Sequence, residues 1–155
     1  RAIHTALTMS RSEWKYVAEV TLQLDEELPC FPALTNEIHQ VLLNLIVNAA
    51  QAIAEKVKGK EEKGSLNIET FREGDFVVVK IQDTGIGIPE ENHHRIFEPF
   101  FTTKPPGKGT GQGLAIAYDV VVYKHGGEIS FTSRAGEGTT FFVRLPLFRR
   151  RECDA

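Results

Sequence analysis

A long helix that is apolar almost all round constrains this sequence more than any other feature. Residues 37–58 follow Thr35 and Asn36, which can cap a helix. A helix whose surface is mostly apolar must be buried. At 3.6 residues per turn its polar side chains fall within an arc of roughly 80°; they are Glu37, Gln40, Asn44, Asn48, Gln51 and Glu55. So narrow a polar stripe on a buried helix faces either a solvent edge or a polar ligand.

Two asparagines in the middle of this stripe favour the ligand. Asn44 and Asn48 lie one turn apart among large aliphatic residues, although asparagine is a poor helix former. Their amides can offer oxygens to a hydrated cation or hydrogens to a phosphate. A solvent edge is the simpler interpretation of Glu37, Gln51 and Glu55.

A glycine-rich turn at residues 83–89 supplies further candidate contacts. Gly85 and Gly87 allow the backbone to turn tightly and to lie against a flat ligand. The Asp83 carboxylate only accepts hydrogen bonds, so it suits an exocyclic amine. In isolation, however, the segment favours a plain turn with a capping aspartate.

A second glycine-rich segment, residues 107–113, precedes a helix predicted at 114–123. Exposed amides at a helix N-terminus form a natural phosphate cradle. The segment is not a Walker A loop, because no Ser or Thr follows its Gly-Lys pair, and it lacks the βαβ context of a dinucleotide fingerprint. Lys104 can neutralise a phosphate, although a lone loop lysine is commonly just solvated, and a flexible surface loop would look similar.

The order of the remaining patterns predicts the fold class. Alternating or hairpin-forming segments predict strands at 15–24, 65–72, 75–82, 128–133 and 139–145, with a short helix at 90–96. Mostly antiparallel strands with helices on one face make an α+β two-layer sandwich. We expect one domain at residues 13–148, preceded by a residual linker or helix end at 1–12 and followed by a tail at 149–155.

Composition excludes several other classes of protein. The net charge is −3, so no broad basic field attracts nucleic acid. No stretch approaches the roughly 20 apolar residues that span a bilayer. The two cysteines, Cys30 and Cys153, lie far apart, which favours a reducing compartment. The neighbouring His93 and His94 do not share a helix face, so we interpret them as surface residues.

Taken in order, these motifs resemble the boxes of bacterial sensor histidine kinases, and specifically the nitrogen-regulatory-type branch. Residues 40–49 resemble the asparagine box and residues 83–89 the first glycine box. Residues 96–104 match the phenylalanine box, residues 109–114 the second glycine box, and residues 125–127 and 136–146 the closing strands. Each motif is modest singly, but their order over about residues 14–146 is highly specific.

The resemblance implies the Bergerat ATP-binding fold, a mobile ATP lid at about 97–111, and ATP with Mg²⁺ as ligands. Asp83 would accept from the adenine amine with Thr139 in support, and Asn48 would bind Mg²⁺. Asn44 and Lys104 would act on the phosphates during transfer. The remaining nucleotide-binding residues would be Gly85, Gly87, Ile88, Gly109, Thr110, Gly111, Gln112, Gly113 and Leu114.

Asn44 separates the candidate activities. The hydrolytic relatives carry a water-activating glutamate four residues before the magnesium asparagine, where this sequence has Asn44, which cannot act as a general base. This favours phosphate transfer to a histidine on a separate dimerisation domain. The alternatives are a gyrase- or MutL-like ATPase, a non-catalytic nucleotide-sensing module and, less favoured, a serine kinase of the anti-sigma type.

The resemblance also implies partners and a location. The phosphoacceptor box would be a His-Glu/Asp-x-x-x-Pro pattern, which His4-Thr5-Ala6 does not match, so this chain should bind ATP without phosphorylating itself. The expected partners are the dimerisation domain of the same kinase and a response regulator. The parent would be a homodimer, free or membrane-anchored, with this domain in the cytoplasm.

Overall fold

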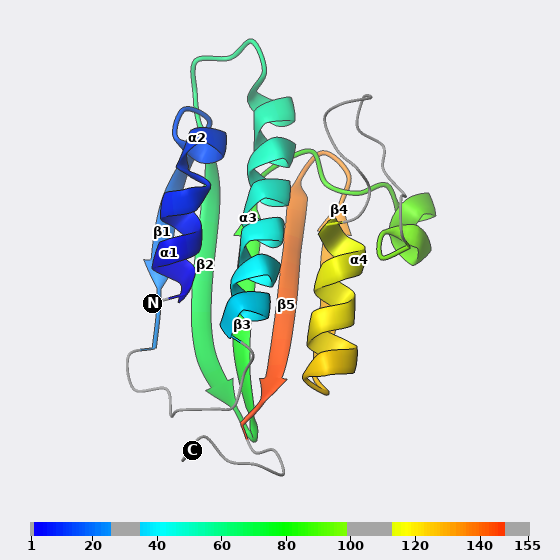
Figure 1. Ribbon diagram of the computed structural model, residues 1–155. Coiled ribbons are helices and arrows are strands. Elements are labelled where there is room, and N and C mark those ends of the chain that lie inside the picture. The colour runs from blue at the N-terminus through cyan, green and yellow to red at the C-terminus, as the bar shows by residue number, and fades with distance from the viewer. Residues whose placement is uncertain (1, 26–34, 99–112, 148–155) are drawn as a thin grey trace.

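A five-stranded sheet carries the helices of the protein on one face (Figure 1). The computed structural model describes residues 2–25, 35–98 and 113–147, and the structural statements below concern these residues. Along the chain the elements are α1 (Ala2–Met9), α2 (Arg11–Trp14), β1 (Ala18–Gln23), α3 (Thr35–Val57), β2 (Gly64–Glu73), β3 (Phe76–Asp83), η1 (Glu90–Arg95), α4 (Gly113–Tyr118), η2 (Asp119–Lys124), β4 (Glu128–Arg134) and β5 (Gly138–Pro146).

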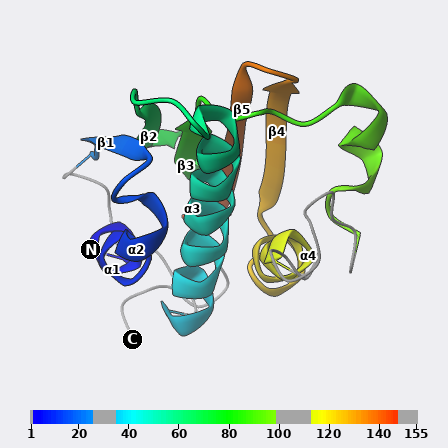
Figure 2. The same ribbon diagram turned by 90° about the horizontal axis from the view of Figure 1, so that it is seen from above.

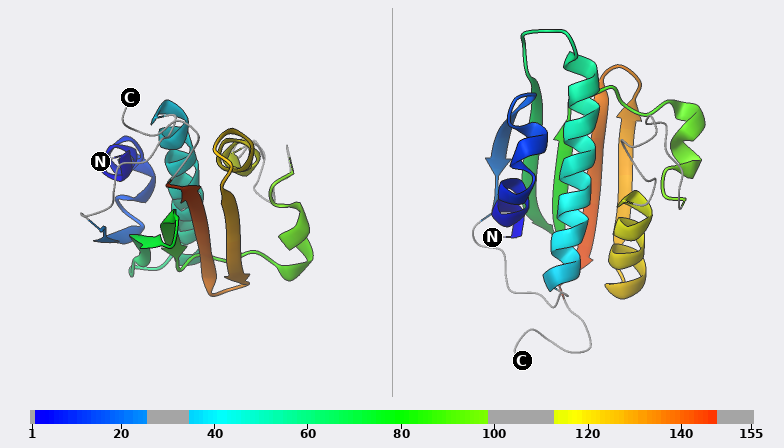
Figure 3. Two further views of the ribbon diagram at one scale, coloured as in Figure 1. Left: turned by 90° about the horizontal axis from the view of Figure 1, so that it is seen from below. Right: turned by 45° about the horizontal axis from the view of Figure 1, so that its top comes forward.

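The strands lie in the order β1-β2-β3-β5-β4. β1 pairs with β2 in parallel, and the three other pairs are antiparallel. A parallel pair needs a crossover connection, and α3 lies within this one. Viewed from above, α1, α3 and α4 form one layer against the sheet (Figure 2), and the same two layers are seen from below and obliquely in Figure 3. The predicted α+β two-layer sandwich is therefore confirmed.

Helix α3 is the centre of the core, as its apolar surface predicts. Leu45, Ile46 and Ile53 are fully buried and belong to one cluster with inward-facing residues of the sheet, including Ile68 and Phe141. Sheet residues alternate between this face and the opposite one, so successive residues of β5 are half-buried and buried in turn. No helix in the described ranges is long and apolar enough to span a membrane.

Residues 2–14 are more structured than the expected linker. Ile3, Ala6 and Leu7 of α1 are buried and belong to the main core cluster. The Trp14 indole N–H donates to the carbonyl of Leu7 at 3.1 Å, which ties α2 back onto α1. The sequence allowed either a linker or a helix end at residues 1–12. The structure shows a helix at residues 2–9, and this helix contributes directly to the core.

The helix predicted at 114–123 has two parts. α4 continues into η2, which is π-helical, and the segment ends at Gly126, where φ is +67°. Glycine adopts this left-handed conformation without steric penalty. The amides of Gly126 and Gly127 donate to the carbonyls of Val122 and Val121, which closes the helix end.

Because Leu7 is 7% exposed and belongs to the core cluster, Leu7→Ala should lower the free energy of unfolding by about 2–5 kcal/mol. The control is Met9→Ala on the same helix, where the side chain is 66% exposed and the expected change is within about 0.5 kcal/mol. Denaturant unfolding of the two variants measures both values. Equal, small effects would mean that α1 is not part of the cooperative unit.

Candidate functional site

Asp83 ends β3 as a buried carboxylate. It is 3% exposed, and one carboxylate oxygen accepts a hydrogen bond from the Gly85 amide at 2.8 Å. Burial raises the pKa of Asp83 from 3.8 to about 6, while the backbone amides of Gly85 and Thr139 pull the pKa down. A carboxylate has two oxygens with about four acceptor positions, so Asp83 retains capacity for a further donor.

The glycine turn after Asp83 lies between α3 and the β4–β5 connection. The Ile86 amide donates to the Ala52 carbonyl of α3 at 3.2 Å, and the Ile86 carbonyl accepts from Gly136 at 2.6 Å. A Cβ on Gly85 would stand 2.6 Å from Ala52, and one on Gly87, whose φ is +73°, would stand 2.2 Å from the Arg134 carbonyl. The two glycines are therefore required by packing as well as by turn geometry.

Thr139 lies opposite Asp83 in the β3–β5 register and is buried. Its hydroxyl is 2.7 Å from the hydroxyl of Ser133 on β4. Ser133 also accepts the Ile88 amide at 2.7 Å and donates to the Gly138 carbonyl at 3.1 Å. Sequence reasoning missed Ser133, because a single serine at the end of a strand carries no motif of its own.

The asparagine stripe of α3 meets the start of α4. The Asn44 side-chain amide donates to the Gly113 carbonyl at 3.1 Å, and its oxygen accepts from Gln40 at 2.7 Å. Because a carbonyl can only accept, this orientation of the amide group is the one that satisfies both contacts. Asn48 is half-buried one turn further along, between this contact and the Ala52 contact with the glycine turn.

The outer parts of the stripe serve other purposes. Glu37 pairs with Lys124 of η2 at 2.8 Å, which fastens η2 to the first turn of α3. Glu55 is exposed, as a solvent edge requires. The polar stripe therefore combines a solvent edge and an inter-helix ion pair with the central asparagines.

Phe97 forms the described part of the predicted aromatic anchor. Its ring lies 5.2 Å from Tyr118, 6.0 Å from Phe131 and 6.5 Å from Phe141. His94 is exposed as predicted, but His93 is half-buried, with its ring 5.1 Å from Phe131. Placing both histidines at the surface was therefore wrong for His93, because η1 turns one of the two rings inward.

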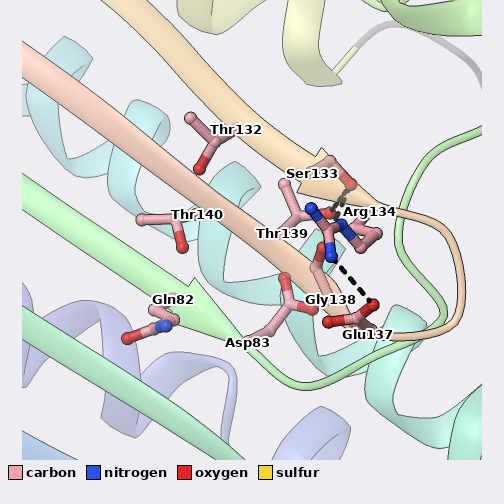
Figure 4. A pocket seen from close by; sticks show the side chains of 9 residues that line it. All are labelled: Gln82, Asp83, Thr132, Ser133, Arg134, Glu137, Gly138, Thr139 and Thr140. Atoms are coloured by element: carbon pink, nitrogen blue, oxygen red, sulfur yellow. Dashed lines mark hydrogen bonds and ion pairs between the residues drawn. The ribbon is translucent and has the colours of Figure 1, made fainter. Parts of the chain in front are cut away.

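A polar hollow of about 350 Å³ surrounds the ends of β3, β4 and β5 (Figure 4). Its lining residues are Gln82, Asp83, Thr132, Ser133, Arg134, Glu137, Gly138, Thr139 and Thr140. Gln82 and Thr140 pair in register and alternate with the inward-facing Asp83 and Thr139, so they lie on the sheet face away from the helices. The hollow thus shares Asp83 and Thr139 with the predicted site, while Gln82 and Thr140 extend it onto the opposite face of the sheet.

Several predicted residues lie outside the described ranges: Lys104, Gly109, Thr110, Gly111 and Gln112. Their assignments stay predictions, as does that of the lid at 97–111 beyond Glu98. Gly113 and Leu114 are described; Gly113 contacts Asn44, and Leu114 is packed against the core. The structure therefore brings Asn44 next to Gly113, and Asp83 next to Gly85 and Thr139.

A family model described as "Histidine kinase-, DNA gyrase B-, and HSP90-like ATPase" matches residues 33–149. The chain belongs to this ATP-binding family.

Within this family, the sequence and structural relatives of the chain are histidine kinases. Sensor kinase CckA of Brucella abortus is 37% identical over 147 residues, covering 88% of this chain and 15% of that protein. Sensor histidine kinase ZraS of Escherichia coli is 33% identical over 144 residues, covering 93% and 29%. The solved catalytic domain of histidine kinase ThkA matches with a TM-score of 0.77 at 31% identity, covering 94% of this chain and 92% of that one. Within its family the chain is a catalytic domain of the protein-histidine kinase type, and it spans less than a third of these two sensor kinases.

Asp83→Asn should make the domain more stable at pH 8. The raised pKa means that ionised Asp83 opposes folding above pH 6, and one pKa unit corresponds to about 1.4 kcal/mol, so the gain is at most about 3 kcal/mol. Between pH 6 and 4 the folded wild type takes up the proton before the unfolded chain does, so the difference between the two proteins should shrink and vanish below pH 4. Denaturant unfolding at pH 8, 6 and 4 measures the difference in the free energy of unfolding. A variant less stable than the wild type at pH 8, or a difference that does not depend on pH, would contradict the raised pKa of Asp83.

Proposed function

We propose that this domain binds Mg·ATP on the helix side of the sheet and transfers the γ-phosphate to a histidine of a separate dimerisation domain. The observation that carries the proposal is the environment of Asn44. Both ends of its amide are engaged, by Gly113 and Gln40, at the position where hydrolytic members of the superfamily have a glutamate. An amide held in this way cannot take a proton from water.

At the nucleoside end, Asp83 accepts from the adenine amine, and Thr139 supports it. Ala52 and Arg134 pack directly against the backbone at Gly85 and Gly87, which fixes the path of the turn. In the proposal the adenine ring lies along this turn, with Ile88 as its apolar neighbour. Within the described part of the chain no cation accounts for the pKa of Asp83, and a buried carboxylate in this position suits a ligand amine. These contacts would fix the orientation of the purine.

At the phosphate end, Asn48 is the proposed Mg²⁺ ligand. Within the described ranges no three His, Cys, Asp or Glu side chains gather to hold an ion. Mg²⁺ is commonly held by one or two protein oxygens together with phosphate oxygens and water, so a single asparagine amide matches its donor requirements. When bound, the ion would neutralise phosphate charge.

The phosphate chain would extend from Asn48 toward Asn44 and the start of α4. We propose that backbone groups of residues 109–114 hold the phosphates and that Lys104 adds positive charge. The incoming histidine nitrogen then attacks the γ-phosphorus, the bond to the β-phosphate oxygen breaks, and ADP leaves. Catalysis of this kind rests on positioning and charge neutralisation.

We also propose, from the relatives, the oligomeric state, partner and location of the parent protein. The parent would be a homodimeric sensor kinase that passes its phosphate to a response regulator, with this domain in the cytoplasm. Gln51 and Ala52, where many relatives have a lysine or aromatic residue, are the basis for placing it in the nitrogen-regulatory-type branch. A gyrase- or MutL-like ATPase and a nucleotide-sensing module are the alternative functions.

Mixing the domain with γ-labelled Mg·ATP and the histidine-hairpin domain of the same parent should move label to the hairpin histidine, with no label on the domain itself. The control is the same mixture without the hairpin, in which phosphate release should be slow. Rapid release of free phosphate without the hairpin would favour the hydrolase. Confirmed ATP binding with no transfer would favour the sensing module.

Asn48→Ala should abolish Mg²⁺-dependent nucleotide binding, because it removes the proposed metal ligand. The matched control is Glu55→Ala, an exposed position two turns further along the same stripe, which should leave binding unchanged. Calorimetric titration of ATP with Mg²⁺ and with EDTA measures the metal-dependent part. Equal metal dependence in Asn48→Ala and the wild type would disprove the role of Asn48.

A further inference from the structure

Ser133 lies where three segments of the site meet, although none of the motifs includes it. It is the penultimate residue of β4, is half-buried, and pairs with Thr139 across the β4–β5 register. Its hydroxyl oxygen contacts the Ile88 amide, the Gly138 carbonyl and the Thr139 hydroxyl at 2.7, 3.1 and 2.7 Å. One side chain therefore joins the glycine turn to the first residues of β5.

The donors and acceptors around this hydroxyl permit only one complete arrangement. A serine hydroxyl has one proton and two acceptor positions. The Ile88 amide can only donate, so it uses one acceptor position of Ser133. The Gly138 carbonyl can only accept, so it takes the Ser133 proton. The contact with Thr139 must then be a hydrogen bond that Thr139 donates.

This arrangement fixes the chemical character of Thr139. With its single proton directed at Ser133, the Thr139 oxygen has only lone pairs to offer elsewhere. Asp83, its partner in the β3–β5 register, accepts but does not donate when ionised. Two neighbouring acceptors suit a ligand group that presents N–H donors, directly or through a water, and they oppose a carbonyl oxygen.

We propose that Ser133 is a positioning residue that directs the Thr139 hydroxyl and thereby sets a preference for 6-amino over 6-oxo purine nucleotides. The inference rests on the proposed function, because it takes the purine to lie at Asp83 and Thr139. In this inference Ser133 affects the choice of purine only through Thr139 and does not contact the ligand itself.

The test compares binding of Mg·ATP and Mg·ITP, which differ at the purine 6-position, by calorimetric titration. In Ser133→Ala, Thr139 loses its acceptor and can turn its proton toward the ligand. ATP should bind about ten-fold more weakly while ITP is not weakened, so the ATP-to-ITP preference falls about ten-fold. Ser133→Thr keeps the hydroxyl and should keep the preference.

A second background separates this role from a general loosening of the turn. Thr139→Val removes the hydroxyl that Ser133 directs, so adding Ser133→Ala to it should leave the preference unchanged. Equal losses for ATP and ITP in Ser133→Ala, or the same fall in preference in the Thr139→Val background, would overturn the inference. If Ser133→Ala does not fold, Ser133→Cys, whose thiol is a weak acceptor, must show the loss of preference instead. A wild-type domain that binds neither nucleotide would refute the proposed function. One that binds both equally would refute the inference and the contact between Asp83 and the purine amine, while ATP binding and phosphate transfer would stand.

Discussion

The contact between the glycine turn and α3 is the constraint on which the site depends. Ile86 donates to the Ala52 carbonyl, and Gly85 has no room for a Cβ against the same residue. On the other side, Gly136 donates to Ile86 and Arg134 leaves no room for a Cβ on Gly87. The turn is therefore fixed from both sides, and with it the position of Asp83 relative to the asparagine stripe. Strong packing of this kind holds a binding site before any ligand arrives.

Asp83 lowers the stability of the fold at the place where we propose that the purine binds. A carboxylate that is 3% exposed opposes folding when it is ionised, and two backbone amides offset only part of the desolvation. A neutral side chain of the same shape would suit the fold better. A charged acceptor in a sheltered place gains most from a ligand that donates to it, because water competes little there. The proposed contact with a ligand amine would therefore account for a residue that stability alone would not select.

Much of this molecule could be predicted from its sequence, and the exceptions have physical causes. The apolar surface of α3 and the hairpin signals predicted the layers, because periodic burial is a local property. Asn44 and Asn48 stood out because asparagine is a poor helix former. Asp83 was assigned only through the resemblance of its turn to a family motif, and the ligand contacts of all three residues remain predictions. α1 has buried residues at helical spacing, Ile3, Ala6 and Leu7, but a helix this short is decided by its partner, α3. Ser133 could not be found, because its contacts depend on strand register.

A structure of the domain with Mg²⁺ and a non-hydrolysable ATP analogue would show directly where the nucleotide and the metal bind. We predict the purine amine against Asp83, the purine ring along the turn of Gly85 and Gly87, and the metal at the Asn48 oxygen on the helix side of the sheet. A nucleotide bound instead on the opposite face of the sheet, against Gln82, Thr132 and Thr140, would contradict the proposed site.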